Sequence, residues 1–137
     1  MRAASAAADA VVHAIRDAGG RALAVAADVA QEDQVLAMFE RVDRELGPVT
    51  ALVNNAGVVD VAARVDEMSL ARLKRMFDIN VIGSFLCARE AIKRMSTKHG
   101  GAGGAIVNVS SAASRLGAPG QYVDYAASKG AIDSFTI

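Results

Sequence analysis

The stretch VTALVNNAG, residues 49–57, indicates the fold class of this chain. Its first half is short and apolar, which is typical of a strand buried on both faces, and its second half turns into polar and small residues that end in glycine. RALAVAAD at 21–28 and AIVNVSS at 105–111 have the same form. The predicted strands are 21–27, 49–53 and 105–110.

Segments with helical periodicity alternate with these strands. Apolar residues recur at helical spacing in 3–18 and 31–46, and Ser69 is placed to cap a further helix. The predicted helices cover 3–18, 31–46, about 69–78, about 81–98, and the chain from about 121 onward. Alternating strands and helices predict a parallel sheet with helices on both faces, and such sheets bind ligands at the carboxyl ends of their strands.

The composition limits the classes of function. Fifteen basic and fifteen acidic side chains leave no net charge, and aromatic residues make up only 4% of the chain, so nucleic acid is not expected as a partner. Cys87 has no second cysteine to pair with, and His13 and His99 lack the spacing of a zinc site, so no metal is expected. Neither a signal peptide nor a transmembrane stretch is recognisable, which predicts a cytoplasmic protein without a membrane partner.

Polar residues follow each predicted strand. They are Asp28, the pair 54–55 and the pair 110–111. Ala56 and Gly57 make the second of these loops small enough for a ligand to approach the backbone, although a plain Asn-Gly turn has the same composition. Asn80 interrupts the apolar segment MFDINVIGSFL, where a polar side chain could also bond its own helix backbone.

Tyr125 and Lys129 lie four positions apart in the stretch YAASKGAID, residues 125–133. On a helix this spacing brings the two side chains to one face, and an ammonium group there stabilises the phenolate and lowers the tyrosine pKa from its reference value of about 10. Such a tyrosine can act as an acid or a base near neutral pH. Alone, the pair is weak evidence of catalysis, because both residues are common.

Four motifs together resemble those of short-chain dehydrogenases/reductases. They are NNAG at 54–57, NVIGSFL at 80–86, IVNVSS at 106–111 and YAASKGA at 125–131, and the resemblance covers essentially the whole chain. It implies a Rossmann-like, doubly wound parallel sheet in a three-layer α/β/α fold that is incomplete in this chain. It also implies an NAD(P)-dependent oxidoreductase that transfers a hydride between a nicotinamide cofactor and a carbonyl or alcohol substrate, in the manner of sugar or 3-oxoacyl reductases.

The resemblance assigns roles to individual residues. Tyr125 would donate or accept the proton at the substrate oxygen, and Lys129 would lower its pKa and bind the nicotinamide ribose. Ser111 would hold and polarise the substrate carbonyl, and Asn80 would bind a water that links Lys129 to solvent. The residues implied to contact the cofactor, besides Tyr125 and Lys129, are Asp28, Val29, Asn54, Ala56 and Gly57.

Two departures from the family pattern affect these expectations. Ser111 precedes Tyr125 by 14 positions, one more than is usual, so Ser110 remains an alternative to it. The glycine-rich turn that cradles the pyrophosphate in the family has no counterpart here. We therefore expect residues 1–137 to be the central part of a single NAD(P)-binding domain, too truncated for activity alone, whether as a fragment, a partly represented protein or a truncated reading frame.

Strand order leads to a further expectation. In the doubly wound order 3-2-1-4-5-6, the strand at 21–27 would be an edge strand whose neighbours are missing. It should therefore not pair with the strand at 49–53.

Several alternatives stay open. The cofactor is NAD or NADP, and the resemblance favours NADP. The chain could instead be a catalytically inactive fragment or a partner-binding remnant of such an enzyme. A sugar-nucleotide epimerase or dehydratase shares the Tyr-Lys pair, but NNAG and the short spacing between motifs argue against it. The helix at 81–98 is apolar around much of its circumference, and with the resemblance this predicts a homo-oligomer, a dimer or tetramer.

Overall fold

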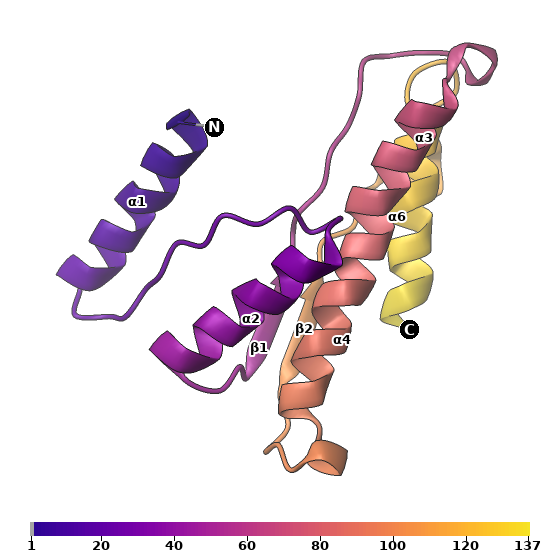
Figure 1. The fold of residues 1–137 in the computed structure, drawn as a ribbon. Coiled ribbons are helices and arrows are strands. Elements are labelled where there is room, and N and C mark those ends of the chain that lie inside the picture. The colour runs from indigo at the N-terminus through magenta and orange to yellow at the C-terminus, as the bar shows by residue number, and fades with distance from the viewer. Residues whose placement is uncertain (1) are drawn as a thin grey trace.

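The computed structural model describes residues 2–137 and consists of helices and a small parallel sheet (Figure 1). A π-helical segment, Asp78–Ile82, joins α3 (Leu70–Phe77) to α4 (Gly83–Met95) into one continuous rod, and 3₁₀ turns occupy Val65–Glu67 and Thr97–His99. The strands are β1 (Ala51–Asn54) and β2 (Ala105–Asn108). The helices are α1 (Arg2–Asp17), α2 (Glu32–Leu46), α3 (Leu70–Phe77), α4 (Gly83–Met95), α5 (Ala113–Leu116) and α6 (Val123–Thr136).

The sheet consists of β1 and β2, which pair in parallel. Ala51 lies opposite Ala105 and Asn54 opposite Asn108, so both strands end at the same edge. The α3–α4 rod makes the crossover that parallel pairing requires. Two of the three predicted strands are thereby confirmed, in shorter form, and all five predicted helices are present.

The prediction of a strand at 21–27 is wrong, because residues 20–28 form an irregular connection. Strand backbone needs hydrogen-bond partners on a neighbouring strand, and none lies beside this segment in the described part of the chain. The related prediction, that this segment does not pair with 49–53, is confirmed.

Helices cover one face of the two strands. Leu52 and Ile106 point from that face into a core formed with α2 and α4. On the opposite face Val53 and Val107 are 61% and 54% exposed, so no described element packs there, and the expected helical cover is met on one side only. The arrangement agrees with an incomplete α/β fold.

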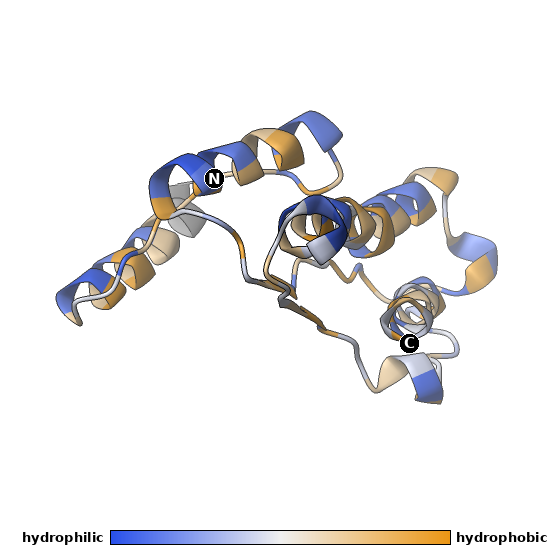
Figure 2. Cartoon of the chain, turned by 90° about the horizontal axis from the view of Figure 1, so that it is seen from below, coloured by the Kyte–Doolittle hydropathy of each residue, from blue (hydrophilic) through white to orange (hydrophobic). Residues whose placement is uncertain are grey.

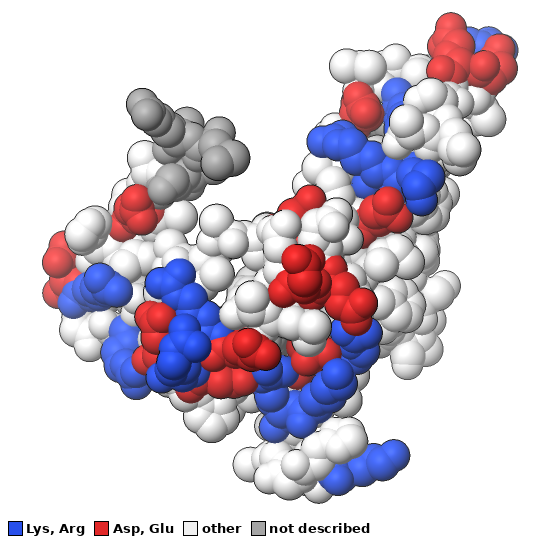
Figure 3. All heavy atoms as spheres, viewed as in Figure 1, with Lys and Arg blue, Asp and Glu red and all other residues white. Residues whose placement is uncertain are grey.

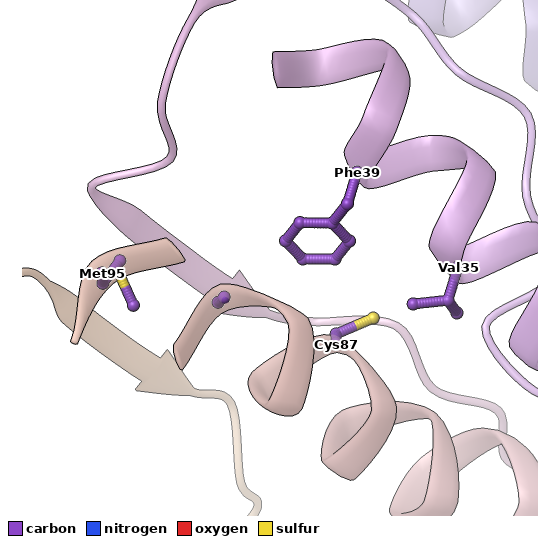
Figure 4. Close-up of a cluster of buried hydrophobic side chains, with 5 residues drawn as sticks. Val35, Phe39, Cys87 and Met95 are labelled. Carbon is purple, nitrogen blue, oxygen red and sulfur yellow. The ribbon is translucent and has the colours of Figure 1, made fainter. Parts of the chain in front are cut away.

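The core is a contact between α2 and α4 (Figure 4). Val35 and Phe39 lie one turn apart on α2, and Cys87, Ala91 and Met95 repeat every four residues on α4, so each helix presents a single apolar stripe. Cys87 packs in this core as a small hydrophobic side chain, and burial raises the pKa of its thiol.

Ion pairs border this core. Arg94 of α4 donates to Asp43 of α2 at 2.7 Å and also to the buried Glu90 at 3.1 Å. Burial opposes ionisation of Glu90, but hydrogen bonds from Lys93 and Arg94 outweigh it and hold its pKa below the ordinary value. Basic and acidic side chains are interspersed over the surface shown in Figure 3, as the balanced composition predicts.

Helix α1 stands apart from the other elements (Figures 1 and 2). Its apolar residues Val11 and Ile15 are 59% and 40% exposed. The helix ends at Asp17, where Gly19 adopts the left-handed conformation with a φ of 81° and the Gly20 amide donates to the Ile15 carbonyl. None of the helices described here has the length and apolar content needed to cross a membrane.

At Gly83, α4 lies close against the connection before α2. A Cβ added there would lie 2.6 Å from Val29 Cγ2 and 3.2 Å from the Val29 carbonyl oxygen. We expect Gly83→Ala to lower the free energy of unfolding by about 1–3 kcal/mol, because overpacking displaces Val29. Urea denaturation of the chain measures this.

Gly130→Ala is the matched control, since a Cβ at that helical position would meet no atom within 4 Å. It should leave stability unchanged or raise it by about 0.4–1 kcal/mol. Equal effects of the two substitutions would contradict the packing argument.

Candidate active site

Tyr125 and Lys129 lie one turn apart on α6, as predicted. Lys129 Nζ is 5.8 Å from the centre of the Tyr125 ring. Lys129 is only 6% exposed, and its Nζ donates to the carbonyl of Val109, just beyond β2, at 2.7 Å. The ammonium group is thus held in the interior beside the phenol.

Small residues let α6 pack closely enough for this arrangement. Ala126 and Ser128, between Tyr125 and Lys129, are both buried. Ser128 Oγ donates to the Tyr125 carbonyl at 2.7 Å and accepts from Asn80 Nδ2 at 3.0 Å. The hydroxyl therefore links the turn that carries Tyr125 to the rod formed by α3 and α4.

Asn80 is buried within the π-helical segment, and its amide binds the backbone of another part of the chain rather than the backbone of its own helix. Its Oδ1 accepts from the Val58 amide at 2.7 Å, while its Nδ2 donates to the Val58 carbonyl at 2.9 Å. The Asn80 carbonyl accepts from Ser84 Oγ at 3.2 Å. Since π-bulges often occur at functional sites, this geometry fits a site residue.

The NNAG loop meets Asn80 and Lys129 at Gly57. A Cβ added to Gly57 would lie 3.4 Å from Asn80 Oδ1 and 3.7 Å from Lys129 Nζ. Ala56 and Gly57 are exposed, so the loop presents bare backbone next to these two polar groups. Gly57, Asn80 and Lys129 therefore form one cluster.

Ser111 and Tyr125 line a common hollow of about 420 Å³, the Tyr125 hollow. Its lining residues are Val59, Ser111, Ala113, Leu116, Gly117, Tyr122 and Tyr125. The alternative serine, Ser110, donates instead to the Lys129 carbonyl at 3.3 Å and is not among the lining residues. The geometry thus favours Ser111 over Ser110 at the hollow.

Three residues expected to contact the cofactor lie outside both the Tyr125 hollow and the cluster of Gly57, Asn80 and Lys129. Asn54 Nδ2 donates to Asn108 Oδ1 at 2.9 Å and to the Ser84 carbonyl, between the two strands and α4. The Asp28 carboxylate accepts from the Ala30 amide at 3.0 Å and borders a separate hollow of about 470 Å³. Val29 packs its side chain against Gly83.

Comparison with known proteins identifies the family. The sequence model of the short chain dehydrogenase family matches residues 1–137. The chain belongs to this family. The resemblance seen in the four motifs is thereby confirmed, together with the Rossmann-like fold class that it implied.

Three curated relatives are between 36% and 55% identical to this chain. The uncharacterized oxidoreductase YgfF of Escherichia coli K12 is 55% identical, with 95% of this chain and 53% of the relative covered. The cis-4-hydroxycyclohexanecarboxylate dehydrogenase of Sinomonas cyclohexanicum is 41% identical, with coverages of 94% and 50%. The 3-oxoacyl-[acyl-carrier-protein] reductase of Synechocystis is 36% identical, with coverages of 96% and 51%. The chain spans about half the length of these relatives.

Sequence reasoning missed several residues that this short-chain dehydrogenase chain uses to hold its site. Ser128 could have been found, because it lies three residues after Tyr125 and next to Lys129 on the predicted helix. Arg72 and Asp124 form a buried ion pair beside Tyr125, but they are 52 positions apart, and neither lies in a recognisable motif.

Asn80→Ala should destabilise the chain. It would leave both backbone groups of Val58 without their partner, and each buried unsatisfied group costs about 1–3 kcal/mol. Hydrogen exchange at the Val58 amide should accelerate well beyond the change at α2 amides. As a control, substitution of the exposed Asn55 by Ala should change the unfolding free energy by less than about 0.5 kcal/mol. Unchanged exchange at Val58 in the Asn80 variant would show that the amide pairing is unimportant.

Proposed function

We propose that residues 1–137 are the central part of a single NAD(P)-binding domain of a cytoplasmic oxidoreductase. The enzyme would transfer a hydride between a nicotinamide cofactor and a carbonyl or alcohol substrate. One observation carries this proposal: Ser111 and Tyr125 line one hollow, and the buried Lys129 ammonium lies beside the Tyr125 ring. Family membership and the dehydrogenase and reductase names of the relatives support it.

The chemistry of the cluster fits a dinucleotide cofactor. Lys129 carries three N–H donors, of which the described structure engages one, on the Val109 carbonyl, so donors remain for ribose hydroxyls. Ala56 and Gly57 offer backbone that a ligand can approach closely. We propose NAD or NADP, with NADP favoured by the resemblance. When bound, the cofactor supplies or accepts the hydride.

Residues of this chain would transfer the proton to or from the substrate oxygen. In the reductive direction, Tyr125 donates its phenolic proton to the substrate oxygen, and the nearby Lys129 ammonium stabilises the phenolate that remains. Ser111 donates a hydrogen bond to the same oxygen as its negative charge grows. Asn80 holds the NNAG loop and α6 together, and the family role adds a bound water between Lys129 and solvent.

The lining of the Tyr125 hollow supports a neutral substrate. Aliphatic side chains and glycine make up most of it, and its polar groups are hydroxyls rather than charged groups. Such a surface suits an uncharged carbonyl or alcohol with apolar parts, as in sugar-like or 3-oxoacyl substrates.

Tyr125→Phe should lower kcat by about 10²–10⁴ in the complete protein that contains this chain, because the hydroxyl that transfers the proton is removed while the ring remains. Consumption of NADPH or NADH with a panel of sugar and 3-oxoacyl carbonyl compounds measures the loss. Tyr122→Phe removes an equivalent hydroxyl from the same hollow and should change kcat by less than about threefold, too little for the loss of a general acid. Near-full activity of Tyr125→Phe would exclude its catalytic role, and an inactive complete protein would favour the partner-binding alternative.

We also propose that the complete protein is a homo-oligomer. Ile82, Phe85 and Ile92 are each nearly half exposed along the rod, and Phe85 stacks on Phe135 of α6 with ring centres 4.0 Å apart. This apolar surface on α4 and α6 would form an isologous contact between two copies.

Phe85→Glu should therefore convert a dimer or tetramer into monomers, since it places a charge in an apolar contact. Analytical ultracentrifugation at micromolar concentration measures the change. Leu70→Glu, at an exposed position of α3, is the control and should leave the assembly intact. A monomeric wild type would contradict the proposal.

A further inference from the structure

Arg72 of α3 contacts two other parts of the chain through one guanidinium group. Its Nε and Nη2 donate to the two carboxylate oxygens of Asp124 at 2.8 Å and 3.2 Å. Its Nη1 donates to the Val61 carbonyl at 2.7 Å. The side chains of Arg72 and Asp124 are 10% and 0% exposed, so this bidentate pair is well shielded from solvent.

Asp124 connects this pair to the backbone of Tyr125. It lies in the first turn of α6, directly before Tyr125, in a helix whose N-cap residue makes no side-chain capping bond. The Arg72 guanidinium lowers the pKa of Asp124, and the backbone N–H of Tyr125 contributes in the same direction. The carboxylate therefore joins the first turn of α6, which leads into Tyr125, to Arg72 of α3.

Val61 connects the pair to the loop that contributes Val59 to the Tyr125 hollow. Val59, two residues earlier, lines this hollow together with Tyr125. A second bond, from the Ala63 amide to the Gln121 carbonyl at 2.7 Å, ties the same loop to the segment before α6. Arg72 thus bridges the loop that carries Val59 and the helix that carries Tyr125.

We propose that Arg72 and Asp124 are positioning residues that set the distance between Tyr125 and the Val59 wall of the substrate hollow. Neither residue lines the hollow, so both act through the groups they hold. The kinetic part of this inference rests on the proposed oxidoreductase function. A lysine at position 72 could not replace the arginine, because an ammonium group lacks the planar fork that serves both carboxylate oxygens and the Val61 carbonyl.

The test uses Arg72→Lys, Arg72→Met and Asp124→Asn in the complete protein that contains this chain. All three should lower kcat/KM by about 10- to 100-fold, with lower kcat from a displaced Tyr125 and higher KM from a displaced loop. A role in stability alone would reduce the active fraction and leave KM unchanged. Arg64→Lys and Arg64→Met are the matched controls, because Arg64 pairs with Asp66 at 3.0 Å but both side chains are 70% exposed. Both controls should keep kcat and KM.

Hydrogen exchange supplies a readout that needs no turnover. Amides in 59–63 and at the start of α6 should exchange faster in the Arg72 and Asp124 variants, while α2 amides keep their protection. If the wild type reduces no carbonyl, the proposed function fails. Faster exchange confined to 59–63 and the start of α6 would still support the positioning role of Arg72 and Asp124. Wild-type kcat and KM in all three variants, unchanged local exchange, or uniform loss of protection that includes α2 would each overturn the positioning role.

Discussion

The side-chain amide of Asn80 is the contact on which the arrangement of the candidate site depends. It is 1% exposed and binds both backbone groups of Val58 as well as the Ser128 hydroxyl. A buried amide that lost these partners would be costly, so the loop after β1 and the helix α6 are held at fixed positions against the α3–α4 rod. The closeness of Gly57 to Lys129 follows from this arrangement.

Two buried charged side chains, Asp124 and Lys129, lie on α6 on either side of Tyr125 in the sequence. Lys129 lies in the interior with a backbone carbonyl as its hydrogen-bond partner, and Asp124 is fully enclosed with Arg72. Burying such groups is unfavourable unless they are paired and hydrogen-bonded, and here each has a partner. Clustering of buried ionisable groups next to an accessible hollow is typical of a functional site.

Packing is concentrated on one side of the sheet. The α2–α4 core covers one face of β1 and β2, whereas Val53 and Val107 of the other face and Val11 of α1 remain exposed. These exposed apolar residues support the proposal that the chain is the central part of a larger domain. The irregular course of 20–28 has a different cause: no described strand lies beside this segment, and an isolated strand has no partner for its backbone groups.

Local patterns in the sequence determined the helices, two strands and the family. Apolar spacing predicted α2, the Ser69 cap predicted the start of α3, where its hydroxyl accepts from the Arg72 amide, and the four motifs identified the short-chain dehydrogenase family. Only the tertiary structure decided that Ser111 rather than Ser110 lines the Tyr125 hollow, that Asn80 binds Val58, and that Arg72 pairs with Asp124. These contacts join residues up to 52 positions apart. They form because the α3–α4 rod, the loop after β1 and α6 pack against one another, and no local pattern of residues specifies that packing.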